Sequence, residues 1–473
     1  MPVSDHHSEY TASLRRIQVV RDCVGGAEMI KKRTGGSNGL WSRPGTRYLP
    51  PPNPADTSIE NTDRYDSYLI RASFVNFTGF TKDGMIGMAF RMPMVVELPP
   101  ELEYLKTNST GDGLHLDQLA QDIVGDVLET GRYGLLADYP PARADMTRAE
   151  VDAAGLFATI KPYIAENIIN WRSETFGSVS RLVMVVLAEM VPIVKDEFTT
   201  ETERGFRVLK LVGGVYQQAT YDKDGKLIQD EITPKKSDGT TWGEIPFCFI
   251  GAQNNDATVD KAPLYDIAEI NVSHYRNSAD YEESSFIVGQ PWPIITGLSQ
   301  SWVTDVLKGG VIVGSRAACL LPVGANAKLV QADPNQLPLA GMEIKEKQMI
   351  MIGARIIQDS TGQETAEAAK IRFAGQNSKL GLIVTNTENG FIKVIEWVKE
   401  FMGSVDDATI TMNKQFYDAT IDPQLLTAQM MASDRGIISK TDIRTNMRKA
   451  QLIAADRTDE QIDQEAAGEN PLI

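Results

Sequence analysis

The sequence is poor in the residue types that build disulfide frameworks and metal centres. Its 473 residues include three cysteines and four histidines. Cys23, Cys248 and Cys319 are odd in number and far apart, which is typical of reduced thiols in a cytosolic protein rather than of a disulfide framework. His274 falls in a helical pattern among polar and apolar residues, where a structural histidine is the simpler interpretation than a metal ligand.

The sequence also lacks the phosphate-binding motifs of nucleotide-dependent enzymes. No Gly-x4-Gly-Lys-Ser/Thr loop occurs, and no Gly-x-Gly-x-x-Gly follows a strand pattern. These absences exclude a P-loop ATPase and argue against dinucleotide-dependent chemistry. We expect a protein that is not an enzyme and that uses no cofactor and no metal.

Long hydrophobic runs are missing as well. No apolar stretch approaches the ~20 residues that cross a bilayer. The longest candidate, residues 182–194, is short and carries Glu189. The first 20 residues hold charges and no apolar segment of the signal-peptide type. The sequence therefore predicts no contact with a membrane.

The net charge is acidic, because 47 basic and 63 acidic residues give −16 at pH 7. Tight binding of nucleic acid depends on neutralising phosphates, so this charge argues against a protein that grips DNA. It does not argue against a conduit, because an acidic wall lowers the adhesion of a sliding polyanion. A second interpretation, that the charge only keeps the protein soluble, stays open.

The length and the composition, 42% hydrophobic and 23% charged, suit two or more globular domains. Residues 1–50 are basic in balance and predict either an arm that docks on a partner or a solvated helix with a flexible lead. The part that follows mixes helical periodicity with β-type runs. Its expected helices are residues 63–80 and 114–130, the latter ending at Gly131, and its expected strands are residues 133–138, 181–191, 206–212, 215–220 and 243–249, the last closing one antiparallel region.

Residues 263–403 have the most distinctive order of elements: a helix, a compact β-rich insert, a second helix, a small polar loop and a very long helix. Pro263 suits the first turn of the first helix, where its missing N–H is not needed. Three glycines are expected to interrupt the long helix. The segments are residues 263–287, 288–336, 337–358, 359–367 and 366–403, and the glycines are Gly375, Gly381 and Gly390.

This order of elements resembles the portal proteins of tailed bacteriophages, the head-to-tail connectors through which DNA is packaged. Three phrases are also similar to one portal subfamily: GTRYLPPP at residues 45–52, YIAENIINW at residues 163–171 and GIISKT at residues 436–441. No single phrase is a catalytic signature. The resemblance depends on the order of these phrases over most of the chain.

The resemblance implies an α+β fold: a portal-like subunit with an α/β wing, a two-helix stem, a small β-rich clip, a long kinked wing helix and a helical C-terminal crown. The implied division is an N-terminal arm and linker at residues 1–58, the wing at 59–262, the first stem helix at 263–287, the clip at 288–336, the second stem helix at 337–358, the tunnel loop at 359–369, the long wing helix at 370–404 and the crown at 405–473.

The resemblance also implies a function. A homo-oligomeric ring of twelve subunits would stand at the capsid vertex, and double-stranded DNA would pass through its channel during packaging and ejection. The ring would dock the terminase large subunit and later the head-tail adaptor, and it would contact the major capsid and scaffolding proteins. The implied location is the portal vertex of the virion, with assembly in the host cytoplasm.

Three sets of residues would carry these contacts. A polar loop with the cations after it would face DNA, acids of the first stem helix would form a wall that repels phosphates, and aromatic and basic residues of the insert would dock partners. Simpler interpretations stay open: a plain connector, a solvated helix face and core tryptophans. The loop set is Asp359, Gly362, Gln363, Glu364, Thr365, Glu367, Lys370 and Arg372; the wall set is Asp266, Glu269, Asp280, Glu282 and Glu283; the docking set is Trp302, Lys308 and Arg316.

Two competing hypotheses remain. Asp333, Glu343 and Lys345 resemble the carboxylate pair and lysine of metal-dependent nucleases, in which the acids hold Mg²⁺ and the lysine orients water. That motif needs its second acid on a strand, whereas Glu343 lies in a charged helical run typical of surface salt bridges. The third hypothesis is another structural virion protein, such as a capsid subunit, which would assemble into a shell.

Overall fold

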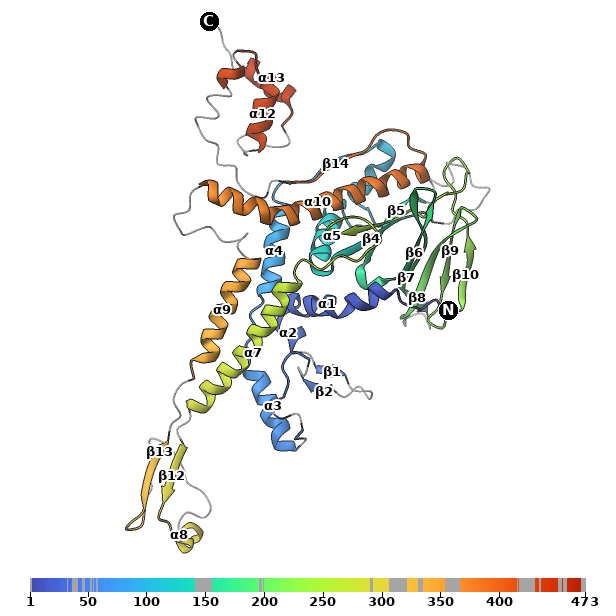
Figure 1. Cartoon of the computed structure of the whole chain (residues 1–473). Helices are drawn as coiled ribbons and strands as arrows, with labels where there is room; N and C mark the ends of the chain where they lie inside the picture. The colour runs from blue at the N-terminus through green and yellow to red at the C-terminus, as the bar shows by residue number, and fades with distance from the viewer. Residues whose placement is uncertain are drawn as a thin grey trace.

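The computed structural model describes residues 2–31, 33–35, 41–44, 47–51, 53, 55–56, 58–140, 155–194, 198, 200–289, 292–305, 321–330, 335–353, 366–414, 416, 430–433, 435–449, 453 and 457–468. Figure 1 shows an α/β body from which a pair of helices projects. Within the described ranges, no helix combines the length and the apolar character needed to span a bilayer.

The body is built on a small antiparallel sheet whose central strand is buried. β4 lies between β11 and β5, and its residues from Arg132 to Ala137 are all buried. Close packing explains the glycine at position 134, because a Cβ there would lie 2.4 Å from Cζ of Phe247. The strands are β4 (Arg132–Asp138), β5 (Thr159–Ile164) and β11 (Phe247–Gly251).

Helix α5 (Leu116–Thr130) packs against this sheet, as its apolar periodicity predicts. Ten of its residues are buried. The helix ends at Gly131, whose φ of 79° is the left-handed conformation that glycine adopts without strain. The predictions of this helix, its end and the buried strand after it are confirmed.

Helix α10 (Ala366–Met402) crosses β4 and β11. It runs unbroken through Gly375, Gly381 and Gly390, so the expected interruptions are wrong. A glycine inside a helix costs only about 1 kcal/mol relative to alanine, which the packing of α10 offsets. Gly390 permits close approach to β11, because a Cβ there would lie 2.7 Å from Cδ1 of Ile250.

A second, five-stranded antiparallel sheet has the order β10-β9-β8-β7-β6. Gly213 and Gly214 turn β8 into β9. Pro192 lies in β7 beyond the last pair that β7 makes with β6, so its missing N–H disrupts no ladder on that side. The strands are β6 (Ile168–Phe176), β7 (Val179–Val194), β8 (Thr200–Val212), β9 (Val215–Tyr221) and β10 (Leu227–Ile232).

The expectation that residues 243–249 close this five-stranded set is wrong. β11 pairs with β4 in the small sheet instead. All five residues of β11 are buried, and such a strand needs cover on both faces. The small sheet supplies that cover because α10 packs on it.

The N-terminal segment belongs to the body. Helix α1 (Ser8–Val24) packs against α4, α5 and α7, and it buries Val19, Val20 and Cys23. One side of this helix therefore packs on the body of its own chain, while Arg15 on the other side is exposed. Docking of residues 1–50 on a partner stays a prediction. Basic residues on its surface suggested solvent exposure, but the apolar residues between them decide its place. The short elements that follow are α2 (Gly26–Ile30), β1 (Arg33–Gly35) and β2 (Trp41–Pro44).

The helix expected over residues 63–80 is two helices, α3 (Ile59–Arg71) and α4 (Phe77–Ala89). Asn76 starts the second one, because its side chain accepts a hydrogen bond from the backbone N–H of Gly79 at 2.8 Å. Such a cap competes with continuation of the preceding helix. The chain thus bends between α3 and α4.

The remaining elements are short. The hydroxyl of Ser439 accepts a hydrogen bond from the N–H of Asp442 at 3.1 Å and caps the start of α12. The elements are β3 (Val95–Glu97) paired with β14 (Thr409–Thr411), the 3₁₀ turns Pro100–Lys106 and Ala165–Asn167, α12 (Lys440–Lys449) and α13 (Asp459–Gly468).

Candidate functional site at the α7–α9 helix pair

The two predicted helices of the central stretch form an antiparallel pair. α7 (Tyr265–Val288) and α9 (Leu337–Ile352) pack along each other. A Cβ on Gly341 would lie 2.3 Å from Nδ2 of Asn277, and a Cβ on Gly353 would lie 2.1 Å from Cδ1 of Ile267. Glycines at both ends of α9 therefore let the two helices approach closely.

Two hydrogen-bonding contacts join the two helices. The ring Nε2 of His274 lies 3.2 Å from Oε1 of Glu346, and Nζ of Lys345 donates a hydrogen bond to the carbonyl oxygen of Ser273 at 3.2 Å. Met349 is the buried residue of α9. Polar contacts and the burial of Met349 therefore both hold the pair together.

His274 has the structural position that its helical context predicts. It is fully buried and lies against the ring of Phe77, 5.7 Å between centroids. In the part of the chain that the structure describes, no three His, Cys, Asp or Glu side chains are arranged to hold a metal ion.

The five acids of the predicted wall lie on α7, but their surroundings differ. Nζ of Lys261 lies 2.7 Å from Asp266, and Glu283 pairs with Arg71. These two negative charges are neutralised locally. The pairing of Glu283 also ties α3 to α7.

The other three wall acids, Glu269, Asp280 and Glu282, make no ion pair with any described residue. Tyr265 donates a hydrogen bond from its hydroxyl to Glu269 at 3.0 Å, and Tyr68 donates one to Asp280 at 2.6 Å. Burial and this bond raise the pKa of Tyr68, so it stays a neutral donor. Asp280 also interacts electrostatically with Lys345 of α9. Glu269 and Glu282 are therefore the two wall acids without a cationic partner among the described residues.

The loop set of predicted residues is mostly outside the described residues. The predicted residues at positions 359, 362, 363, 364 and 365 all lie outside the described residues. Glu367, Lys370 and Arg372 lie on the first turns of α10, and the structure gives the backbone but not the side chains of this stretch. The assignment of this set to DNA contact stays a prediction.

The insert lies at the far end of the helix pair (Figure 1). Strands β12 (Trp292–Thr296) and β13 (Asn326–Val330) form a hairpin-like pair, and α8 (Gln300–Asp305) follows β12. Trp302 is half-buried on α8, and its indole N–H has no acceptor among the described residues. Lys308 and Arg316, the other two predicted docking residues, lie outside the described residues.

The nuclease hypothesis needs Glu343 and Lys345 to face one site, but on α9 the two side chains point in different directions. Both residues lie on α9, where neighbours two apart do not face each other. The Lys345 amine binds the carbonyl of Ser273 instead. Asp333 lies outside the described residues.

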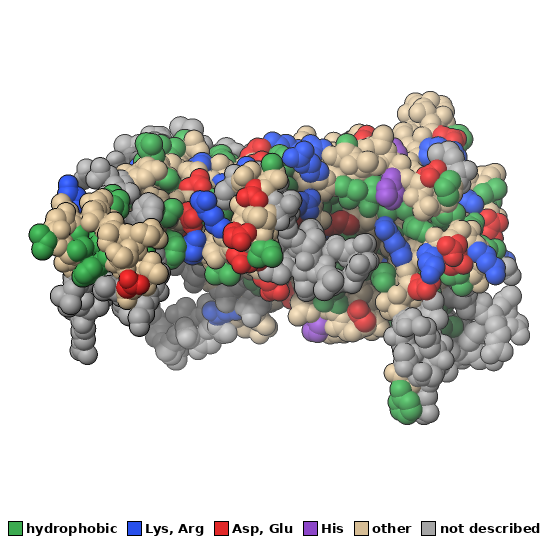
Figure 2. All heavy atoms as spheres, turned by 90° about the horizontal axis from the view of Figure 1, so that it is seen from below, with side chains coloured by type: hydrophobic (Ala, Val, Ile, Leu, Met, Phe, Trp, Pro, Cys, Tyr) green, Lys and Arg blue, Asp and Glu red, His purple; other side chains and the backbone are tan. Residues whose placement is uncertain are grey.

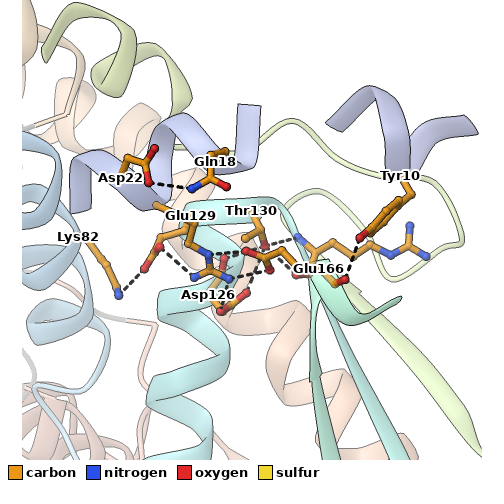
Figure 3. Close-up of polar contacts among 10 residues, drawn as sticks. Tyr10, Gln18, Asp22, Lys82, Asp126, Glu129, Thr130 and Glu166 are labelled. Carbon is orange, nitrogen blue, oxygen red and sulfur yellow. Dashed lines mark hydrogen bonds and ion pairs between the residues drawn. The ribbon is translucent and has the colours of Figure 1, made fainter. Parts of the chain in front are cut away.

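A buried ion cluster, which the sequence analysis missed, anchors α1 beside the base of α7. Arg21 contacts Asp126 at 2.8 Å, Glu129 at 2.9 Å and Glu166 at 2.9 Å. Figure 3 shows the three carboxylates converging, with Lys82 reaching Glu129 from the side. The partners are distant in sequence, so no local pattern could have indicated this cluster.

Three carboxylates against two cations leave the cluster with an excess negative charge. Burial raises the pKa of Asp126 to about 7, and Arg21 opposes this shift only in part. The guanidinium of Arg21 keeps its proton, because its bonds to Glu166, Asp126 and Glu129 raise its pKa. Arg21 therefore holds α1 in place. The Asp126 carboxyl, with its pKa of about 7, is partly protonated near neutral pH.

Figure 2 shows the molecule from the end at which the insert lies. Lysine and arginine side chains are interspersed with aspartate and glutamate over this face, and no continuous acidic band is visible on it. Hydrophobic side chains gather at the left end, where the insert lies in Figure 1. Exposed apolar residues of the insert include Val323 and Leu329.

Comparisons with known proteins identify a similar family over part of the chain. The model of a domain of unknown function, DUF4055, matches residues 263–402. This segment coincides with α7, the insert, α9 and α10. No curated protein matches the sequence.

Three solved structures of gene transfer agent (GTA) particles contain similar chains. A chain of the virion of the native GTA particle has 14% identity and a TM-score of 0.40, covering 81% of this chain and 92% of that one. A chain in the neck of the empty GTA particle, computed with C6 symmetry, has 13% identity and a TM-score of 0.41, covering 80% and 92%. A chain in the neck of the native GTA particle, computed with C12 symmetry, has 12% identity and a TM-score of 0.39, covering 80% and 92%.

Proposed function

We propose that this chain is a portal-type subunit, which assembles head-to-tail into a closed ring of about twelve copies around a DNA channel. The observation that carries the proposal is the α7–α9 pair. It projects from the body, carries an insert at its far end and leads into the long helix α10. This is the order of stem, clip, stem and wing helix that the portal resemblance implies.

The charge on α7 supports a channel wall in this proposal. Glu269, Asp280 and Glu282 make no ion pair with a described residue, although Asp280 interacts with Lys345, and in a ring each would recur once in every subunit. A ring of like charges repels a polyanion and lets it slide without adhesion. The acidic net charge of the chain agrees with such a conduit.

The proposal assigns partners to the two ends of the helix pair. The insert would dock the terminase large subunit during packaging and the head-tail adaptor afterwards, with Trp302, Lys308 and Arg316 at its surface. The body would contact the major capsid and scaffolding proteins. The loop before α10 would face the DNA at the inner end of the channel.

The mass and shape of the purified protein test the proposal. Light scattering and negative-stain images should show closed rings of about a dozen copies with a stain-filled centre, because head-to-tail contacts close under rotation. A closed shell would favour a capsid subunit instead. A protein that stays monomeric at high concentration, with and without scaffold and capsid partners, would overturn the proposal.

The acidic wall has its own test in assembled rings. Glu269→Gln, Asp280→Asn and Glu282→Gln together should raise the affinity of the ring for double-stranded DNA at low salt. The matched control removes three exposed acids elsewhere, with Glu28→Gln, Asp406→Asn and Asp407→Asn, and should change DNA affinity less. Equal effects of the two triple variants would show that α7 does not line the channel.

A further inference from the structure

Helix α9 exposes a row of large apolar residues. Leu337, Ile344 and Met351 are 80%, 57% and 55% exposed. They are seven residues apart, which is two helical turns, so they lie along one side of the helix. Most soluble surfaces scatter such residues singly, whereas a row on one side of a helix marks a contact with another helix. We call these three residues the α9 row.

Three more exposed apolar residues follow one another along the chain where α3 passes into α4. Ile70, Val75 and Phe80 are 76%, 46% and 64% exposed. They come from the end of α3, the bend between the helices and the first turns of α4. We call these three residues the α3–α4 row.

The two rows run along the same length of α7 and in the same direction. α9 passes Asn277 at Gly341 and reaches Ile267 at Gly353. The α3–α4 segment passes Ser278 at Ser73, whose N–H donates to the Ser278 hydroxyl at 3.0 Å. Both segments are therefore antiparallel to α7.

The α3–α4 segment continues toward the same end of α7. The hydroxyl of Thr78 lies 3.0 Å from Oδ1 of Asn271, and Thr81 lies beside Gly353 together with Ile267. Figure 1 shows α7 between α9 and α3. In a ring whose axis follows α7, equivalent residues of all copies lie at one height, so the α9 row of one copy meets the α3–α4 row of the next.

The charges beside the rows are complementary. Lys347 lies within the α9 row between Ile344 and Met351, and Asp83 lies one turn beyond Phe80. Both are exposed, and no ion pair engages either of them among the described residues. Lys347 lies one turn before Met351, and Asp83 lies one turn past Phe80, so the two charges flank the Ile267 end of the rows. A lysine on one surface and an aspartate on the other favour mutual contact and oppose contact of either surface with itself.

We infer that the α9 row of one copy docks on the α3–α4 row of a second copy, with Lys347 facing Asp83. The inference rests on the proposed ring and names the residues of its interface. Because the two surfaces differ, the contact is heterologous, and repetition of it closes a ring or extends a filament.

The test uses one charge in each row. Ile344→Glu and Phe80→Glu should each leave a folded subunit, because both positions are exposed, and each should weaken assembly by more than about tenfold. Mixing the two variants should give a heterodimer and nothing larger, because only one competent pair of surfaces remains. Ile228→Glu, which changes an isoleucine of β10 that is 53% exposed, is the control and should assemble like the unchanged protein.

A charge exchange tests the paired residues. Lys347→Asp and Asp83→Lys should each weaken assembly, and the double variant should restore it. Rings formed by Ile344→Glu or Phe80→Glu at the normal concentration would overturn the inference and leave the proposed ring intact. Monomers in the mixture, or loss of rings in Ile228→Glu, would also overturn it. Failure of the unchanged protein to assemble would instead overturn the proposed function.

Discussion

Helices α5 and α9 have similar lengths and opposite surroundings. α5 buries ten of its 15 residues, whereas α9 buries one of its 16. Both carry apolar residues at helical spacing. The apolar side of α5 packs on the small sheet of its own chain, and the apolar row of α9 faces solvent.

The difference shows that the body and the helix pair obtain their stability from different sources. The body buries its apolar side chains within one chain, so it should fold alone. The helix pair leaves three large apolar residues of α9 exposed, Leu337, Ile344 and Met351. Burial of these residues against another chain agrees with the proposed assembly.

The largest expected effect is a loss of stability when the ion cluster of Arg21 is broken. Arg21→Met should lower the free energy of unfolding by about 3–5 kcal/mol, because it leaves the buried Glu129 and the partly buried Asp126 and Glu166 without their shared cation. Urea denaturation at one fixed protein concentration measures the change. Arg15→Met on the exposed side of α1 is the control and should stay within about 0.5 kcal/mol. Equal stability of the two variants would show that the cluster does not anchor α1.

The comparison of α5 with α9 can be made directly with one substitution in each. Leu119→Ala should lower the free energy of unfolding by about 2–5 kcal/mol, since Leu119 is fully buried. Ile344→Ala should change it by less than about 0.5 kcal/mol when the protein is too dilute to assemble. A large loss in dilute Ile344→Ala would mean that α9 is already buried within its own chain.

The close approach of α9 to α7 predicts a smaller effect. Gly353→Ala should lower the free energy of unfolding by about 1–3 kcal/mol, because the new Cβ meets the buried side chain of Ile267. Gly87→Ala on α4 is the matched control, since a Cβ there meets nothing within 4 Å. That control should be neutral or stabilise by up to about 1 kcal/mol. A harmless Gly353→Ala would contradict tight packing of the pair.

The last expected effect is a dependence of stability on pH. The Asp126 carboxyl keeps its proton up to about pH 7 in the folded protein and loses it near 3.8 when unfolded. The folded state binds more protons in this window, so this contribution is fully present below pH 3.8 and is lost as pH rises through 7.

Asp126→Asn removes this titration. Its stability should fall less steeply between pH 4 and pH 7, by at most about 1.4 kcal/mol per pH unit. Urea denaturation across this range compares the two slopes. Asp406→Asn, at an exposed aspartate outside the cluster, is the control. Parallel slopes for Asp126→Asn and the unchanged protein would contradict a raised pKa at Asp126.

Much of the fold could be predicted from local pattern. The periodicity of α5, the glycine at its end and the buried strand after it each depend on neighbours in sequence. The split between α3 and α4 was missed because the Asn76 cap lies inside an unbroken helical pattern. The row Leu337, Ile344, Met351 was visible as a repeat of seven, although the sequence could not say that nothing within the chain covers it.

The sequence by itself determined the elements whose causes are local: helix and strand periods, caps, turns, and the order of helix, insert, helix and long helix. Only the tertiary structure decided which charged side chains pair with one another. The partners of Arg21 lie 105, 108 and 145 residues away, and the acids of α7 divide into paired and unpaired by contacts with α3 and Lys261. Local periods follow from backbone geometry, whereas burial and charge compensation depend on distant segments brought together by packing.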